Sequence, residues 1–134
     1  MTGQHPGIRN DRILQMIDKV LNVDDMADMI KKKLLMGGQR LSIYGMGRIG
    51  KIIVRELKNT DIPFSELYDR RGGEEWIFQG MTVKKSTDAL DKEKDNVILI
   101  TVTDEKISEK IIADLRSFGF LGDIVTVSEL FDKY

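Results

Sequence analysis

The chain has 134 residues, of which 41% are hydrophobic and 32% charged, with a net charge of −1 at neutral pH. This length suits one domain and is too short for a dehydrogenase with a separate substrate domain, while the composition is typical of a globular protein. The near-zero net charge provides no strong positive field, so we expect no nucleic-acid partner. The absence of cysteine excludes disulfides, thiolate catalysis and cysteine-ligated metals.

The only histidine is His5, so we expect no histidine-based metal site or catalytic triad. No Tyr-x-x-x-Lys or Ser-x-x-Lys arrangement occurs either, and we predict no catalytic residue and no metal ligand. No apolar run approaches the roughly 20 residues of a membrane span, and no signal peptide is recognisable. We therefore expect a cytoplasmic protein that has no membrane partner.

Residues 1–10 are expected to be disordered, because this segment is polar and contains proline and glycine. The first helix is predicted from Asn10 to Leu21, where apolar residues follow the i, i+3, i+4, i+7 spacing of one helix face. Asn10 or Asp11 would be its N-cap.

A second helix is predicted from Asp24 or Asp25 to Met36, with Gly37 and Gly38 as the stop signal. The apolar stripes of the two helices contain Ile13, Met16, Ile17, Val20, Leu21, Met26, Met29, Ile30 and Leu34. These stripes need a partner surface, and we predict that the helical pair forms or completes a twofold homodimer. The alternative is that both helices pack back on their own domain as an extra layer.

The most informative segment is the hexapeptide Gly45-Met46-Gly47-Arg48-Ile49-Gly50, which follows a short strand-like run over residues 40–44 and opens a helix predicted over residues 48–58. The next strand, residues 64–68, ends at Asp69. A strand, a G-x-G-x-x-G turn, a helix, a strand and an acid in this order are typical of a dinucleotide-binding βαβ unit.

Each glycine of this segment has a distinct expected role. Gly45 would form the tight turn, Gly47 would let the backbone approach a pyrophosphate, and Gly50 would let the helix pack closely on the strand. The helix N-terminus offers free N–H groups and the positive end of the helix dipole to phosphates. The alternative is a structural turn that binds nothing.

Asp69 is a candidate ligand of a ribose diol, although an aspartate at a strand end often bonds only to its own turn. Arg70 and Arg71 could hold a phosphate, or could be a solvated loop. Further along the chain, Thr101 and Thr103 are candidate ribose contacts, while Thr103 or Asp104 could simply cap the following helix. Trp76 could stack on a base, but for a single tryptophan we favour burial under the loop.

The remaining elements continue the α/β alternation. One or two short strands are predicted over residues 76–83, a short helix over 86–90, a buried strand over 96–102, a helix ended by Gly119, a last strand over 123–127, and a final turn capped by Ser128. This order predicts an α/β fold with a small Rossmann-like doubly wound parallel sheet (residues 39–134), preceded by the N-terminal tail and helical pair (residues 1–38).

From Arg40 onward the chain resembles the small Rossmann-type domains of bacterial polysaccharide and nucleotide-sugar biosynthesis proteins. These include the N-terminal domains of sialic-acid-type sugar O-acyltransferases and domains attached to sugar epimerases, dehydratases and methyltransferases. The matching segments are residues 41–50, 66–70, 78–83, 96–103 and 124–130. The resemblance implies that the glycine turn and Asp69 contact a nucleotide, while the catalytic modules of these proteins are absent here.

The sequence therefore predicts a binding domain for a small-molecule nucleotide, NAD(P) or a nucleotide-sugar, linked to bacterial surface-sugar metabolism or its regulation. The alternative is a structural or dimerisation domain that keeps a Rossmann fold without a ligand.

Overall fold

The computed structural model describes residues 4–73 and 75–132, and for residues 4–11 only the backbone. Its elements are α1 (Gln4–Leu21), α2 (Met26–Leu34), β1 (Arg40–Tyr44), α3 (Arg48–Leu57), β2 (Phe64–Tyr68), β3 (Ile77–Phe78), β4 (Met81–Lys84), α4 (Ser86–Ala89), β5 (Asn96–Ile100), α5 (Glu105–Ser117), β6 (Ile124–Thr126) and α6 (Val127–Leu130). The chain is thus of the mixed α/β class.

The strands form a six-stranded sheet in the order β3-β4-β2-β1-β5-β6 within the described residues. All neighbours are parallel except β3 and β4, which form an antiparallel hairpin. The carboxyl ends of the three central strands are in register, because Tyr44 pairs with both Tyr68 and Ile100. From β1 the chain crosses to β2 on one side, whereas β5 and β6 extend the sheet on the other. Parallel sheets with such a reversal of strand order place ligands at these carboxyl ends.

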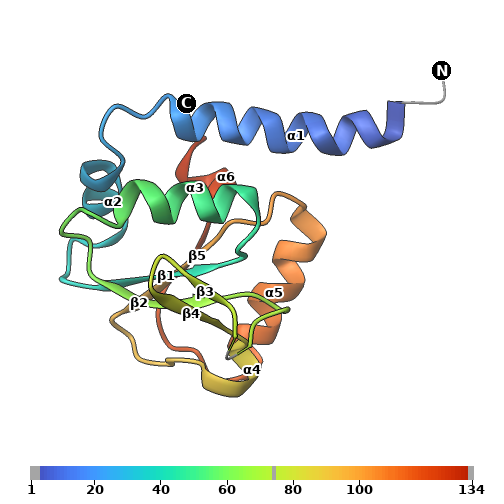
Figure 1. The fold of residues 1–134 in the computed structure, drawn as a ribbon. Helices are drawn as coiled ribbons and strands as arrows, with labels where there is room; N and C mark the ends of the chain where they lie inside the picture. The colour runs from blue at the N-terminus through green and yellow to red at the C-terminus, as the bar shows by residue number, and fades with distance from the viewer. Residues whose placement is uncertain (1–3, 74, 133–134) are drawn as a thin grey trace.

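Both faces of the sheet are covered, as alternate residues of the buried strands show (Figure 1). Leu41, Leu67 and Leu99 belong to the hydrophobic cluster on the α3 side, whereas Ile98 and Ile100 belong to a second cluster with residues of α5. A strand whose two faces are both buried reads as a continuous apolar run, which explains the sequence of β5. This layering is compatible with a Rossmann-like fold.

The two N-terminal helices pack on their own chain, both against α3 (Figure 1). Met16, Val20 and Ile30 are buried in the cluster that also contains residues of α3 and α6. Asp25 is the N-cap of α2, since its carboxylate accepts the N–H of Asp28 at 3.0 Å, and the helix ends at Leu34, two residues before the predicted Met36.

The expectation of disorder over residues 1–10 is wrong for residues 4–10, which are the first turns of α1, and residues 1–3 lie outside the described part. Consequently neither Asn10 nor Asp11 can be the N-cap. Pro6 is tolerated there because the N–H groups of a first helical turn have no helical acceptor.

The C-terminal third differs from the prediction in two places. β5 ends at Ile100, two residues early, because residues 101–104 turn away into α5. The cap of α6 is Thr126 and not Ser128: the Thr126 side chain accepts the N–H of Glu129, whose carboxylate accepts the Thr126 N–H. This reciprocal pair is a capping box. Gly119, at φ +91°, ends α5 as predicted.

Candidate functional site

The turn after β1 depends on Gly45, whose φ of +108° favours glycine. A methyl group at this position would lie 2.6 Å from the hydroxyl oxygen of Thr101, so the turn also requires a minimal side chain. The Gly45 N–H donates to the carbonyl of Tyr68 at 2.8 Å, which ties the turn to the end of β2.

Gly50 and Gly47 differ in what surrounds them. A methyl group on Gly50 would overlap the carbonyl oxygen of Gly45, so close packing of α3 on the turn requires a glycine. At Gly47 no atom lies within 4 Å of such a methyl group, and the φ of −82° is available to any residue. The fold therefore explains Gly45 and Gly50 but does not explain Gly47.

Gly47 is the N-cap of α3, and no side chain caps this helix. The N–H groups of its first turn are therefore left for another acceptor. Arg48 is exposed beside them, and Ile49 is largely buried. The side chain of Met46 is fully buried in the core, so only the backbone of this predicted site residue belongs to the turn.

Asp69 closes the site from the end of β2 and is 6% exposed. Its carboxylate accepts the N–H of Met46 at 2.8 Å, the N–H of Arg71 at 2.9 Å and the Nε–H of Arg71 at 3.1 Å. Burial raises the pKa of Asp69, but the hydrogen bonds from Arg71 and Met46 outweigh it and lower the pKa overall. Asp69 is thus an ionised group that already binds its own turn, the simpler of its two predicted roles.

Thr101 and Thr103 have different environments at the end of β5. Thr101 is 5% exposed, and its hydroxyl donates to the carbonyl of Gly45, so it supports the turn from below. The cap of α5 is Asp104, which accepts the Ile107 N–H at 3.1 Å. Thr103 is not required for capping and lines the cleft beside α3.

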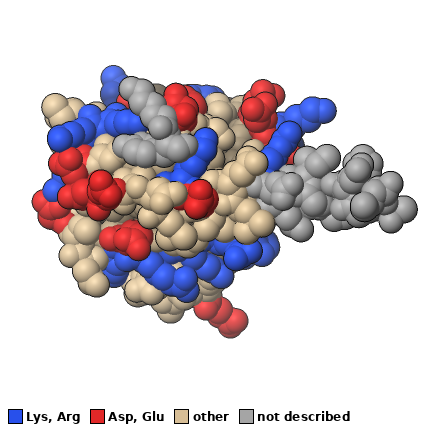
Figure 2. Space-filling view, turned by 90° about the horizontal axis from the view of Figure 1, so that it is seen from above, with Lys and Arg blue, Asp and Glu red and all other residues tan. Residues whose placement is uncertain are grey.

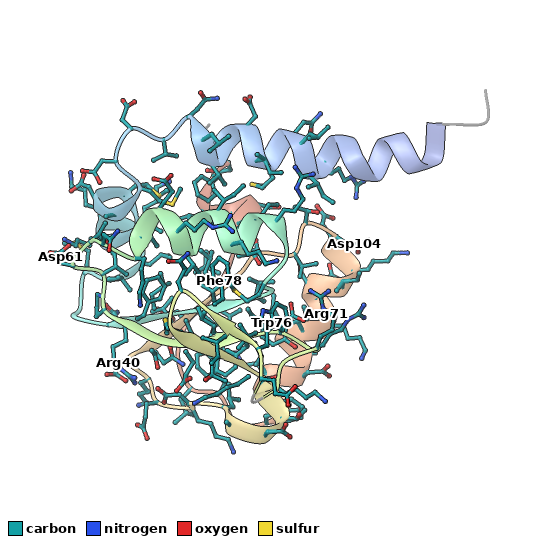
Figure 3. The ribbon with its side chains drawn as sticks, viewed as in Figure 1. Arg40, Asp61, Arg71, Trp76, Phe78 and Asp104 are labelled. Atoms are coloured by element: carbon teal, nitrogen blue, oxygen red, sulfur yellow. The ribbon has the colours of Figure 1, made fainter. Side chains whose placement is uncertain are left out.

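These elements enclose a cleft of about 290 Å³ above the carboxyl ends of the strands. Its lining comprises Arg12, Ile13, Gly45, Gly47, Arg48, Ile49, Gly50, Asp69, Arg71, Thr101, Val102, Thr103, Asp104 and Ile107. A second hollow of about 340 Å³ adjoins it towards α5 and shares Gly45, Asp69 and Arg71 with it. The predicted Arg70 lines only this second hollow. Figure 3 shows Arg71 and Trp76 on the side of the sheet where Asp104 begins α5.

Three arginines and two aspartates, Asp69 and Asp104, line the cleft. Arg12, Arg48 and Arg71 line the cleft, and of these only Arg71 forms an ion pair within residues 4–73 and 75–132. The face seen from above carries interspersed basic and acidic side chains (Figure 2). The guanidinium groups of Arg12 and Arg48, which form no such ion pair, and the N-terminus of α3 favour an anionic ligand.

The structure distinguishes the two candidate arginines and adds one that the sequence did not indicate. Arg71 contacts Asp69 and lies 5.2 Å from the centroid of the Trp76 ring, whereas Arg70 does neither. Arg12 comes from α1, far from the glycine turn in sequence. Its position one helical turn before the apolar Met16 shows that it faces the domain, but no sequence pattern indicates which edge of the sheet α1 crosses.

Two kinds of site are not found in the part of the chain that the structure describes. No cluster of histidine and carboxylate side chains could hold a metal ion. No helix has the combination of length and apolar character that crossing a bilayer requires.

Comparisons with protein-family models, with curated proteins and with solved structures found no match to this chain. The resemblance to domains of polysaccharide biosynthesis proteins thus stays a prediction.

Proposed function

We propose that this chain is a Rossmann-like domain with a doubly wound sheet that binds a nucleotide, NAD(P) or a nucleotide-sugar, at the carboxyl ends of β1, β2 and β5. The nucleotide's phosphates would accept N–H groups of the first turn of α3, next to Arg48. The proposal assigns binding to this chain and no catalytic step.

Gly47 carries this proposal. A glycine that neither a positive φ nor a close contact requires is unexplained by the apo fold. A phosphate that approaches the backbone would explain it, because any side chain at the N-cap would occupy the same space. The fold alone would favour Ser or Asp at this position, since both cap helices at least as well as glycine.

Asp69 is the proposed ribose ligand, with one condition. A carboxylate offers about four lone-pair sites, and the N–H groups of Met46 and Arg71 with the Arg71 guanidinium already use them. The Arg71 side chain is 64% exposed, so a ribose hydroxyl can take its place at little desolvation cost. The released guanidinium would then be available to a phosphate.

The pathway is a proposal that derives from the family resemblance alone: a cytoplasmic role in bacterial surface-sugar metabolism or its regulation. Residues 41–50 and 66–70 support it, because they contain the turn and the acid that the resemblance assigns to nucleotide contact.

Calorimetric titration and thermal-shift measurements with NAD, NADP, UDP-sugars, CoA and ATP test the proposal. A ligand at 100 times its Kd should stabilise the protein by about 2.7 kcal/mol. Gly47→Asp should abolish this response through repulsion of the phosphates while the apo protein stays folded. Gly73→Asp is the matched control, because Gly73 also has open space and lines neither hollow. A folded wild type that responds to none of these ligands contradicts the proposal.

The second candidate is a structural or dimerisation domain without a ligand. One observation favours it: among the described residues, no buried side-chain nitrogen or oxygen lacks a hydrogen-bond partner. The buried side chains of the site are thus satisfied without a nucleotide. A partner-binding function that Gly47→Asp leaves unchanged would support this second candidate.

A further inference from the structure

Helix α1 supplies part of the wall of the cleft. Arg12 and Ile13 line it opposite the glycine turn and Thr103. The helix is held in this position by Met16 and Val20, which are 7% and 2% exposed and pack into the main core. Residues 12 and 16 are four positions apart and lie on the same helix face, so anchoring Met16 also directs Arg12 towards the domain.

Arg12 also lines a further hollow next to the cleft. This hollow, of about 250 Å³, lies between α1 and the segments that follow β5 and β6, and it shares Arg12 and Thr103 with the cleft. Polar groups dominate its lining: Gln15 and Lys19 from α1, with Glu105 and Ser128 opposite. A ligand group that passes Arg12 would therefore enter a polar space.

The charges at this junction suit a second phosphate. Neither Arg12 nor Lys19 has an ion-pair partner in the described part of the chain. Of the acids nearby, Asp69 is bound to Arg71, whereas Asp104, the cap of α5, and Glu105 in the polar hollow form no ion pair within the described residues. Arg12 is the cation that both spaces share, and a guanidinium binds phosphate oxygens through paired N–H donors.

We propose that Arg12 binds the distal phosphate of a nucleoside diphosphate, and that the polar group attached to this phosphate occupies the hollow between α1 and Ser128. The proposal rests on the proposed function, which places the proximal phosphate at α3. It assigns the distal phosphate of such a ligand to Arg12, and its sugar or second nucleoside to the polar hollow. The N-terminal helix is then part of the binding site.

Calorimetric titration of the full chain with AMP, ADP, UMP and UDP tests the role of Arg12. Arg12→Ala should lower the affinity for the diphosphate of the preferred base about tenfold or more, because a charge-assisted contact is lost. It should change the affinity for the monophosphate less than twofold. Arg12→Lys should recover part of the loss. Lys94→Ala, which removes one exposed positive charge just before β5 and away from the cleft, should change neither affinity.

A second variant tests the polar hollow. Gln15→Trp places a bulky ring at an exposed position on the rim of the polar hollow. It should lower the affinity for NAD or UDP-glucose and leave the affinity for ADP and UDP unchanged. Equal thermal unfolding temperatures of the apo variants show that the fold is intact.

The outcomes separate the two proposals. If the wild type binds diphosphates and Arg12→Ala binds them as tightly as Lys94→Ala does, the inference about Arg12 is wrong and the proposed function stands. If Arg12→Ala loses the same factor of affinity for monophosphates as for diphosphates, the assignment of Arg12 to the distal phosphate is also wrong. A folded wild type that binds no nucleotide overturns both.

Discussion

At the scale of single residues, the three glycines of the turn have separable roles. Gly45 is required by its φ of +108°, and Gly50 by the carbonyl oxygen that a side chain would overlap. Gly47 has neither requirement. A motif that looks uniform in the sequence thus consists of two structural positions and one position that the proposed ligand would explain.

Stability measurements can verify this division. Gly50→Ala should lower the free energy of unfolding by about 2 kcal/mol or more, because α3 must move away from backbone that cannot yield. Gly47→Ser should leave stability unchanged or raise it by about a few tenths of a kcal/mol, since serine is a good N-cap and meets no atom. Urea unfolding measures the free energy of unfolding of both variants. If the two variants lost equal stability, the division into structural glycines and Gly47 would be wrong.

Asp69 provides a prediction about pH. Its pKa is lower in the folded protein than its ordinary value of 3.8, so its stabilisation is complete above that value and is lost as the pH falls through the lower folded pKa. Asp69→Asn should cost about 2 kcal/mol at pH 7, because an amide cannot accept hydrogen bonds from Met46 and Arg71 on both of its atoms.

Urea titrations at pH 7 and at steps from pH 5 to 2 provide the measurement. The difference in unfolding free energy between wild type and Asp69→Asn should shrink below about pH 4. The exposed Asp24→Asn variant is the control for general charge effects. A difference that does not change with pH would show that the carboxylate charge is not what stabilises the turn.

At the scale of elements, caps determine where the short helices begin. Asp25, Asp104 and Thr126 each accept an N–H group in the first turn of the helix they precede. The box at Thr126 holds α6 in position, so that Leu130 and Phe131 are buried beneath α1.

Thr126→Val tests this capping box. Valine keeps the shape of threonine and removes the oxygen, so stability should fall by about 1 kcal/mol. Ser128→Ala should change it by less than about 0.5 kcal/mol, because Ser128 is exposed and does not cap the helix. If the serine variant lost more, residue 128 would be the cap after all.

At the scale of the whole molecule, the N-terminal helices bury most of their apolar stripe against their own chain. This is the packing that was the alternative to dimerisation. Among the described side chains of α1 and α2, Leu14 and Leu21, at 53% and 62% exposed and two turns apart on α1, are the large apolar ones that this packing leaves uncovered. A homodimer stays a proposal, and these two residues define the surface it would use.

We predict that a dimer, if it forms through α1, is dissociated by the double variant Leu14→Lys/Leu21→Lys. Two lysines on each copy would repel one another across a twofold contact. Sedimentation equilibrium at micromolar concentration compares wild type with this variant, and Met36→Lys, an exposed apolar position beyond α2, is the control. A monomeric wild type would contradict the dimer. Removal of residues 1–37 is a poorer test, since it would uncover the core beneath α1 and α2.

The sequence by itself predicted the α/β class, the succession of helices and strands along the chain and the glycine turn with Asp69 at the end of β2. These features depend on local periodicity, on glycine and on capping residues, which act over a few positions in the chain. The short strands β3 and β4 were predictable for the same reason, because Gly80 marks a turn within residues 76–83. In the structure, Gln79 and Gly80 form this turn with φ of 50° and 78°.

Only the tertiary structure decided which side chains meet. Arg40 binds Asp91 and Asp95 across the sheet end opposite the cleft, and Arg12 from α1 lines the same cleft as the glycine turn. Both arrangements bring together residues that are far apart in the chain, so no spacing rule encodes them. The ion pair of Arg71 with Asp69 joins residues that are close in the chain. It was nevertheless not predictable, because the adjacent Arg70 and Arg71 are equivalent in sequence. The direction of the chain after β2 determines which of them faces the carboxylate.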